Sequence, residues 1–456
     1  MTSRIAQLVE KALALSTADA CVVLGRESTQ ANIRWANNTS TTNGVVSSEA
    51  LSVVSIRDGR VGSVARTYVP DDGVEDVVRA SEAACDGRPR AEDEMPLIDG
   101  AAEAGFDADA PVTGIEVFAP FVPQLAAAFD RAKSDGRVLY GYAEHTTSTV
   151  YLGTSTGMRK RHTNAAGTVE CTGKTSDLTS SAWVGRATGD FTDVDVDAMH
   201  DRLAQRLAWS KNKIELPADR YEVILEPSAT ADMLLFGYFS AGARAADEGR
   251  SVYSKAGGGN RIGEQLFGDG ITLVSDPREP GMEVTPFQTA IASSPQSSVF
   301  DNGIDTQATT WVDKGVLTNL ASSRYWAQKT GGTPTPFIPN YFFRSDDGPT
   351  VEELIANTKR ALLVAALWYI RTVDPRTLLL TGLTRDGVYL VEDGEVVGSV
   401  NNYRFNESPV DMLTRAVEIG PSEPTLGREI GDSFPFVKMP PLRVDGFNMS
   451  SVSQAQ

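Results

Sequence analysis

The sequence predicts an α+β protein with three parts: an N-terminal α/β layer over residues 1–95, a middle antiparallel sheet with helices over residues 110–215, and a mainly β C-terminal domain with a buried helix over residues 216–456. Three observations predict this organisation. The 456 residues are roughly three times the ~150 residues of an average domain. Alternating polar and apolar segments, typical of strands, recur along the whole chain. A few segments with helical spacing separate them.

The N-terminal part is predicted to be a strand meander covered by helices. Residues 1–15 place apolar side chains at helical spacing, and residues 20–24 indicate a short buried strand. Asn43-Gly44 and Asp58-Gly59 are dipeptides that favour tight turns, so we expect a hairpin at each. Residues 71–84 open with acidic side chains and predict a helix that packs on the strands.

A segment without periodicity, residues 86–112, predicts a boundary between the first two parts. Beyond it, residues 114–132 and 195–209 indicate helices. Three polar, threonine-rich segments between those helices alternate in the manner of an antiparallel sheet with one solvated face: residues 140–151, 160–168 and 180–187.

The C-terminal part opens near Leu216 and is predicted to be rich in strands. A strand over residues 221–225 leads into a helix over residues 228–246 that is apolar almost all round, so we expect it to be buried on most sides. Further strands are expected over residues 271–274, 309–312, 377–383, 387–392 and 395–400.

Composition excludes several classes of function. The net charge of -18 argues against nucleic-acid binding, because phosphate backbones attract basic proteins. Three widely spaced cysteines are too few and too scattered for a disulfide framework. The most apolar window, residues 361–370, is half the length that a membrane-spanning helix needs. We therefore expect a cytoplasmic protein that has no membrane partner.

Motifs for catalysis are weak. Residues 153–157 match G-x-S-x-G, but the polar strand that follows favours a hairpin turn over a hydrolase nucleophile at Ser155. The aspartates at 193, 195 and 197 fit the start of a helix better than a calcium loop. No histidine follows His200 and no cysteine follows Cys171, so residues 216–456 cannot build an ordinary catalytic zinc site from His and Cys.

Several motifs of the C-terminal part, taken in order, resemble those of the TldD/PmbA family of modulator-of-gyrase proteins and peptidases. They are Phe-Asp-Asn-Gly at 300–303, Lys-Gly-Val-Leu at 314–317, Val-Asp-Pro-Arg-Thr at 373–377, Thr-Gly-Leu-Thr-Arg-Asp-Gly at 381–387, Val-Glu-Asp-Gly-Glu at 391–395, residues 400–408, residues 440–444 and residues 447–451.

The resemblance implies a metallopeptidase family whose catalytic branch carries a His-Glu-x-x-x-His zinc motif on the helix after the first C-terminal strand, with a late cysteine ligand. Here that helix reads Ala-Asp-Met-Leu-Leu-Phe-Gly-Tyr-Phe-Ser-Ala-Gly over residues 231–242, and residues 424–438 contain no cysteine. The resemblance therefore implies the PmbA/TldE-like branch. Such a chain has no cofactor and is not catalytic on its own, and it partners a TldD-like zinc subunit that cleaves small peptides or unfolded segments.

Two groups of residues are candidates for a role in such a complex. On the predicted helix, Phe236 and the small residues Gly237, Ser240 and Ala241 would leave room where a metal sits in the catalytic branch, although such buried residues are more often explained by ordinary core packing. A second group, Asn401, Asn402 and Arg404, could bind a peptide backbone or could simply cap a hairpin. The alternative function is a stand-alone peptide-binding or regulatory homodimer without protease activity.

Overall fold

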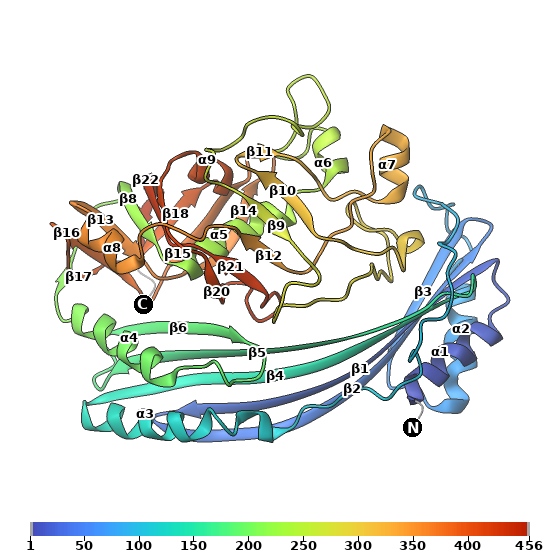
Figure 1. The fold of residues 1–456 in the computed structure, drawn as a ribbon, viewed down its shortest axis with the longest axis horizontal. Helices are drawn as coiled ribbons and strands as arrows, with labels where there is room; N and C mark the ends of the chain where they lie inside the picture. Colours follow the sequence, from blue (N-terminus) through green and yellow to red (C-terminus); the bar gives the residue numbers. More distant parts are fainter. Residues whose placement is uncertain (1–2, 454–456) are drawn as a thin grey trace.

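The computed structural model of the protein describes residues 3–453 and has two layers (Figure 1). One layer is a long six-stranded antiparallel sheet with helices on one of its faces. The other layer is the C-terminal unit, which is rich in strands and lies against the opposite face of the sheet. The mixed α+β class predicted from the sequence is confirmed.

The long sheet joins the predicted N-terminal and middle parts. Its strand order is β3-β2-β1-β4-β5-β6, and β1 pairs with β4 from Val22↔Thr154 to Trp35↔Gly141. The connection over residues 86–112, where a boundary was predicted, contains no helix and only isolated bridge residues, Ala102 and Ala108. The strands are β1 (Ala20–Ala36), β2 (Thr39–Arg57), β3 (Arg60–Thr67), β4 (Arg137–Thr154), β5 (Arg159–Thr175) and β6 (Ser181–Thr188).

Helices cover one face of this sheet because each presents an apolar stripe to it. Ile5, Leu8 and Val9 of α1 are buried against Val23 of β1, and Leu203 of α4 is buried in the cluster that α3 forms with the other end of the sheet. Residues 1 and 2 of the predicted first helix lie outside the described residues. The helices are α1 (Arg4–Leu15), η1 (Asp71–Gly73), α2 (Val74–Ala83), η2 (Ile115–Phe118), α3 (Val122–Ser134) and α4 (Val196–Trp209).

Two predictions for the N-terminal strands are wrong. The strand predicted over residues 20–24 continues to Ala36, because β1 is paired along its length with β2 and β4. The predicted Asn43-Gly44 turn lies inside β2, and the chain reverses at Asn37 and Asn38, whose φ angles are 52° and 57°. Asparagine tolerates this left-handed conformation, so the pair forms a two-residue hairpin turn. The predicted Asp58-Gly59 turn is confirmed between β2 and β3.

The C-terminal unit contains three sheets, with strand orders β19-β22-β8-β13-β16-β17-β7, β11-β10-β9-β12-β21-β20 and β14-β15-β18-β23. Its strands are β7 (Lys213–Ile214), β8 (Asp219–Leu225), β9 (Leu273–Ser275), β10 (Thr309–Asp313), β11 (Val316–Leu317), β12 (Tyr341–Phe343), β13 (Arg360–Val364), β14 (Leu367–Asp374), β15 (Leu379–Thr384), β16 (Val388–Glu392), β17 (Glu395–Val400), β18 (Tyr403–Glu407), β19 (Ala416–Ile419), β20 (Glu423–Thr425), β21 (Val437–Met439), β22 (Leu442–Met449) and β23 (Ser451–Val452). The remaining helices are α5 (Pro227–Phe239), α6 (Ala243–Asp247), η3 (Val299–Asp301), α7 (Arg324–Thr330), α8 (Val351–Ala356) and α9 (Pro409–Thr414).

The helix predicted over residues 228–246 is divided into α5 and α6. The chain leaves helical geometry at Gly242, and the amide of Ala243 donates to the carbonyl of Ala321 at 2.8 Å. The amide of Ala321 donates in turn to the carbonyl of Ala241. Pairing with this neighbouring segment replaces the hydrogen bonds that would continue the helix. As predicted, α5 is buried on most sides.

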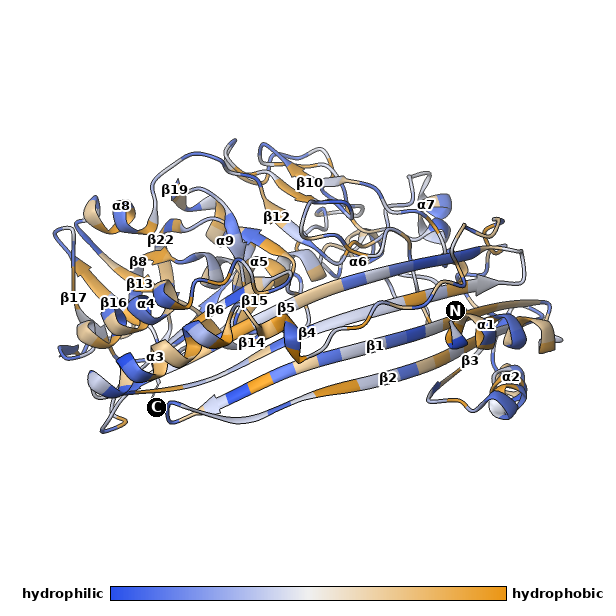
Figure 2. Ribbon diagram, turned by 60° about the horizontal axis from the view of Figure 1, so that its bottom comes forward, coloured by the Kyte–Doolittle hydropathy of each residue, from blue (hydrophilic) through white to orange (hydrophobic). Residues whose placement is uncertain are grey.

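Polar contacts connect the two layers near α4. Arg206 of α4 is almost fully buried and forms an ion pair with Glu226, at the start of α5. On β6, which packs against α4, the hydroxyl of Ser181 donates to Asp386 of the C-terminal unit. Figure 2 shows alternating hydropathy along the long strands of the sheet. Within residues 3–453, no helix is long and apolar enough to cross a membrane.

Candidate functional site at the α5 junction

The candidate site lies where α5 meets the loop of residues 426–436 and the start of β14; we call it the α5 junction. Helix α5 follows β8, a strand inside the seven-stranded sheet, and Pro227 occupies its first turn, where a missing amide hydrogen is tolerated. The loop connects β20 to β21. Thus the helix and the late segment that the family resemblance singled out lie together in space.

A buried carboxylate connects these three segments. Asp232 of α5 is fully buried, and its two oxygens accept hydrogen bonds from the backbone amides of Leu367 and Glu429, each at 2.9 Å. Burial raises the pKa of Asp232 to about 7, because an apolar environment disfavours the charged form, while the two amide donors oppose this effect. Asp232 therefore fixes both the loop and β14 to the helix.

A second carboxylate extends this network to the surface. Glu429 accepts hydrogen bonds from the amides of Tyr369 at 2.8 Å and Ile370 at 3.2 Å, and Arg371 contacts it at 3.0 Å. Tyr369 has a φ of 57°, so β14 is irregular at this point. The carboxylate supplies the acceptors that a regular strand partner would otherwise provide.

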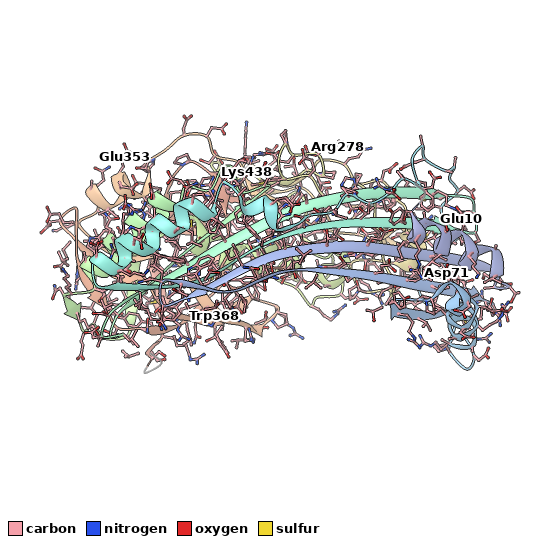
Figure 3. All side chains as sticks on the ribbon, turned by 90° about the horizontal axis from the view of Figure 1, so that it is seen from below. Glu10, Asp71, Arg278, Glu353, Trp368 and Lys438 are labelled. Atoms are coloured by element: carbon pink, nitrogen blue, oxygen red, sulfur yellow. The ribbon has the colours of Figure 1, made fainter. Side chains whose placement is uncertain are left out.

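Arg428 joins the junction to the long sheet. Its guanidinium lies 5.2 Å from the ring of Trp183 on β6 and 5.4 Å from the ring of Trp368 on β14. It also donates to Asp386 at 2.6 Å. In Figure 3, Trp368 lies toward the opposite end of the molecule from Glu10 and Asp71, which belong to the α1 and α2 end. A cation held between two aromatic rings and a carboxylate is a well-ordered contact between the layers.

The C-terminal half of α5 is surrounded by aromatic side chains. Tyr238 stacks on Tyr341, with ring centroids 4.3 Å apart, and on Phe337 at 4.7 Å. Its hydroxyl donates to the carbonyl of Ile338 at 2.7 Å. Phe239 meets Phe434 of the loop edge to face at 5.4 Å. This half of the junction is a packed apolar core.

The predicted residues of the helix lie at this packed end. Phe236 is half-buried, and the carbonyl of Gly237 accepts a hydrogen bond from the hydroxyl of Tyr253 at 3.2 Å. Ser240 caps the helix, and its carbonyl accepts from the hydroxyl of Ser251. Ala241 is buried. These contacts fit the packing explanation, and a role in shaping a cavity stays a prediction.

The second predicted group lies elsewhere, at the connection between β17 and β18. The amide of Leu216 donates to the side-chain oxygen of Asn401 at 2.7 Å, and the amide of Ser453 donates to the carbonyl of Asn402 at 2.7 Å. Arg404 on β18 is exposed and reaches Thr381 at 3.4 Å. Asn401 and the Asn402 backbone therefore hold chain segments in place, and peptide binding by this group stays a prediction.

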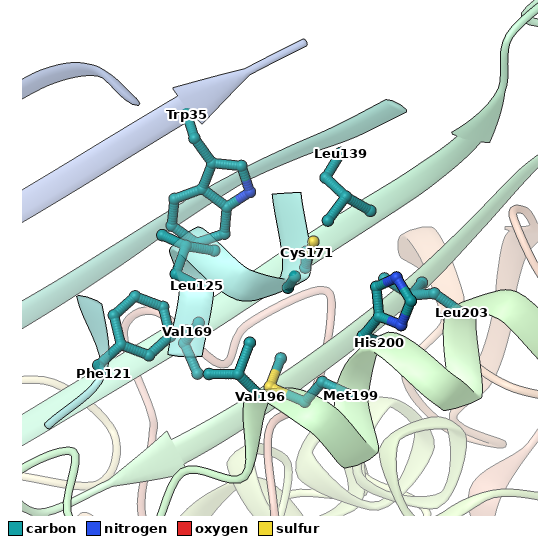
Figure 4. Close-up of a pocket in the computed structure, with 11 residues that line it drawn as sticks. Trp35, Phe121, Leu125, Leu139, Val169, Cys171, Val196, Met199, His200 and Leu203 are labelled. Carbon is teal, nitrogen blue, oxygen red and sulfur yellow. The ribbon is translucent and has the colours of Figure 1, made fainter. Parts of the chain in front are cut away.

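Cavities also occur away from the α5 junction in the described part of the chain. An apolar cavity of about 20 Å³ between α3, α4 and the sheet is lined by Trp35, Cys171 and His200, among others (Figure 4). A cavity of about 180 Å³ with a mixed polar and apolar lining lies beside β2, between Glu27, Glu49 and the loop at residues 110–112. Ser155 lies in the hairpin between β4 and β5, as predicted, and its hydroxyl accepts from the amide of Cys21.

Comparison with known proteins places the fold. The sequence model of one protein family, the PmbA/TldA metallopeptidase C-terminal domain, matches residues 218–451, which are just over half of the chain. The chain belongs to the PmbA/TldD family. It is thus a member of a metallopeptidase-related family, and the α5 junction lies within the matched domain. No curated protein sequence matches the chain.

Solved structures of similar fold cover nearly the whole chain. TldE from Thermococcus kodakarensis superposes with a TM-score of 0.75 at 17% identity, covering 97% of this chain and 98% of the other. A candidate modulator of DNA gyrase from Bacteroides thetaiotaomicron gives 0.78 at 16% identity, with 98% of each chain covered. Another candidate modulator of DNA gyrase, from Thermotoga maritima, superposes with a TM-score of 0.77 at 15% identity, covering 97% of this chain and 99% of the other. At these identities the likeness establishes the fold.

The residues of the α5 junction do not fit a zinc ion. Zinc sites in proteins use three or four His, Cys or carboxylate ligands. Between residues 3 and 453, no three side chains of these types converge on one point. One residue of α5, Asp232, is of a suitable type, but backbone amides occupy both of its oxygens.

Sequence reasoning missed the polar residues that organise the junction. Asp232, Arg428 and Glu429 were not among the predicted site residues. Asp232 carried a usable signal, because a lone carboxylate in an otherwise apolar helix must find buried partners. Arg428 and Glu429 carried none, since a loop with two adjacent charges is normally solvated.

Proposed function

We propose that this protein is a metal-free subunit that pairs with a zinc-bearing TldD-like peptidase subunit, and that the pair degrades or processes small peptides and unfolded segments. In this assembly the partner supplies the zinc and the hydrolytic chemistry. The present chain supplies walls, contacts and stability. It needs no cofactor of its own.

The observation that carries the proposal is the chemistry of the α5 junction. The helix and the loop at which the catalytic branch would hold zinc are both present and adjacent here. Their facing side chains are Tyr238, Phe239 and Phe434, together with the amide-bound carboxylate of Asp232. The chain thus keeps the adjacent helix and loop of a metallopeptidase fold but lacks the zinc ligands. This combination is what we expect of a supporting subunit.

The distribution of ligand residues supports the same proposal. All three histidines and all three cysteines precede residue 201, outside the matched domain of residues 218–451. His145 is buried and engaged, with its ring nitrogens bonded to the Thr113 hydroxyl and the Gly189 carbonyl. Burial lowers the pKa of His145 and so disfavours its charged form.

The test compares three preparations: this chain alone, a TldD-like subunit from the same organism alone, and the two expressed together. We expect the two chains to copurify, with about one zinc per pair by elemental analysis. We also expect the pair to cleave a reduced, carboxymethylated polypeptide. This chain alone should hold less than a tenth of an equivalent of zinc and should show no cleavage.

Two outcomes would contradict the proposal. One zinc per chain in the isolated protein, or peptidase activity of that protein, would show that it is itself a metallopeptidase. Failure to copurify with the zinc subunit, combined with tight binding of peptides by the chain alone, would favour the alternative of a stand-alone peptide-binding or regulatory homodimer. The Ser155→Ala variant excludes a serine hydrolase if any activity is unchanged.

A further inference from the structure

The chain contains two Asn-Gly dipeptides, Asn43-Gly44 and Asn302-Gly303. In such a dipeptide the side-chain amide of asparagine can reach the next backbone nitrogen, and glycine has no Cβ to hinder this approach. The two groups therefore react with each other unless the surrounding structure keeps them apart. The fold places the two dipeptides in opposite environments.

Asn302-Gly303 is held in place by hydrogen bonds. Asn302 is 1% exposed, and its side-chain nitrogen donates to the carbonyls of Ala290 and Val299, each at 2.8 Å. Its side-chain oxygen accepts from the amide of Ala290 at 2.7 Å. The backbone nitrogen of Gly303 donates to the carbonyl of Gln288 at 2.9 Å. Both groups that would have to meet are therefore engaged with other partners.

The side chain of Asn43 has no such restraint. It is exposed, and among the described residues it makes no hydrogen bond. Val45 and Val46 are 49% and 57% exposed. Because successive side chains of a strand point to opposite faces, this part of β2 is open to solvent on both faces. A Cβ built on Gly44 would meet no heavy atom within 4 Å, so the approach to its nitrogen is not crowded.

One neighbouring strand holds this part of β2 among the described residues. β2 pairs with β1 from Thr39 to Ile56, whereas β3 pairs only with the segment from Ala50 to Arg57. Figure 2 shows β2 as the outermost strand of the sheet, with β3 beside it only near α1 and α2. Gly44 faces Asn32 of β1, so the reaction requires this end of the hairpin to open. Segments with exposed hydrogen bonds and few buried side chains open most readily.

The local preference of the dipeptide favours such opening. Asn-Gly is among the strongest signals for a tight turn, yet Asn43-Gly44 lies in an extended strand. A bulge at Thr41 already interrupts the pairing with β1 two residues earlier. A conflict between local preference and fold weakens the structure at that point. Once the pairing with β1 opens, the dipeptide leaves the extended conformation that keeps its two reacting groups apart.

We propose that Asn43 is a site of spontaneous deamidation in the folded protein and that Asn302 is protected. The backbone nitrogen of Gly44 gives its proton to water and bonds to Cγ of Asn43. The bond from Cγ to Nδ2 breaks, and ammonia leaves with a proton taken from water, so that a succinimide ring remains.

One water molecule then opens the succinimide ring. Addition at Cγ restores the original backbone and gives aspartate. Addition at the backbone carbonyl carbon gives isoaspartate, in which the chain runs through Cβ and Cγ. Neither step needs an oxidant or a reductant. Either product puts a carboxylate into residues 42–48 of β2, which read Thr-Asn-Gly-Val-Val-Ser-Ser and otherwise carry no charge.

Peptide mapping by mass spectrometry tests the proposal on the full-length chain. After a week at pH 8 and 37 °C, we expect Asn43 of the folded protein to be deamidated at least tenfold more than Asn302. In 6 M guanidinium chloride the two residues should react at rates within about twofold of each other, because no fold then protects either. A sample digested at the start corrects for deamidation during digestion. Chromatography should resolve both isoaspartate and aspartate at position 43.

Gly44→Ala is the matched variant. Alanine fits at this position, because the space is open and the φ angle of Gly44 is not positive, while its Cβ hinders attack by the nitrogen. This variant should slow deamidation of Asn43 at least tenfold. Gly268→Ala, at another open glycine without a positive φ, should leave the rate at Asn43 unchanged. Circular dichroism of both variants verifies that they fold.

The proposal is overturned if Asn43 reacts no faster than Asn302 in the folded chain. It is also overturned if Gly44→Ala leaves the rate at position 43 unchanged, since the Gly44 nitrogen would then not be the attacking group. The reaction does not depend on the proposed peptidase partnership, which zinc content and cleavage test separately.

Discussion

At the α5 junction, the backbone amides of Leu367, Glu429 and Tyr369 each donate to a carboxylate of a neighbouring segment. Along residues 42–48 of β2, by contrast, the outer backbone groups have no strand partner among the described residues. Both regions belong to irregular or terminal parts of sheets. The difference shows that buried backbone groups of this chain find partners within the chain. At the exposed, uncharged edge of β2, the backbone groups are left without a strand partner among the described residues.

The comparison predicts opposite sensitivities to substitution, and the largest expected difference concerns packing. Tyr238→Ala removes a ring that is 2% exposed and stacked on two others, so we expect the free energy of unfolding to fall by about 3–5 kcal/mol. Val45→Ala at the edge should change it by less than about 0.5 kcal/mol. Urea denaturation followed by tryptophan fluorescence measures both. Equal losses would show that the edge is as tightly packed as the core.

Asp232→Asn sharpens the comparison through pH. The amide group of asparagine replaces one acceptor with a donor, so one buried backbone amide loses its partner, at a cost of about 1–3 kcal/mol. The pKa of Asp232 is raised to about 7 in the folded protein from 3.8, so the folded state binds the additional proton between these values. The contribution of Asp232 to stability is then greatest near pH 4, falls as the pH rises towards 7, and is constant above it.

We therefore expect the melting temperature of the wild-type protein to exceed that of Asp232→Asn by more at pH 5 than at pH 8. Differential scanning fluorimetry at the two pH values measures this. A difference between the two proteins that does not change with pH, or that increases with pH, would contradict the assignment of a raised pKa to Asp232.

The smallest expected effect concerns the cation between the layers. Arg428→Lys keeps the positive charge but loses the planar group between Trp183 and Trp368, so we expect a loss of about 1–2 kcal/mol. The matched change Arg404→Lys alters an exposed side chain and should have an effect within about 0.5 kcal/mol. Urea denaturation of the two variants distinguishes these outcomes. Equal effects would mean that the aromatic contacts do not stabilise the folded chain.

Local signals predicted much of the fold. Asp58-Gly59 forms the predicted turn, and helices and strands occur close to most of their predicted positions. Asn43-Gly44 has an equally strong turn signal but lies within β2. There, pairing with a strand of seventeen residues outweighs the preference of two residues for a turn.

The candidate site could be predicted only in part. The sequence indicated a buried helix and the importance of the late loop, and both lie at the α5 junction. It could not indicate the partners of Asp232, because Leu367 and Glu429 are 135 and 197 residues away along the chain. Such contacts depend on the tertiary fold. For Asn401, Asn402 and Arg404, local composition could not separate peptide binding from a structural role.

The pairing of β1 with β4 has a consequence for folding during synthesis. The β1, β2 and β3 meander is complete once Thr67 has been made, but the inner edge of β1 finds its partner only when residues up to Thr154 have emerged. At ribosomal rates of ~5–20 residues per second, this delay is roughly 4–17 s. During this time the nascent chain exposes the unpaired inner edge of β1 in addition to the partly free outer edge of β2. The most hazardous period for aggregation is therefore expected before the protein is half translated.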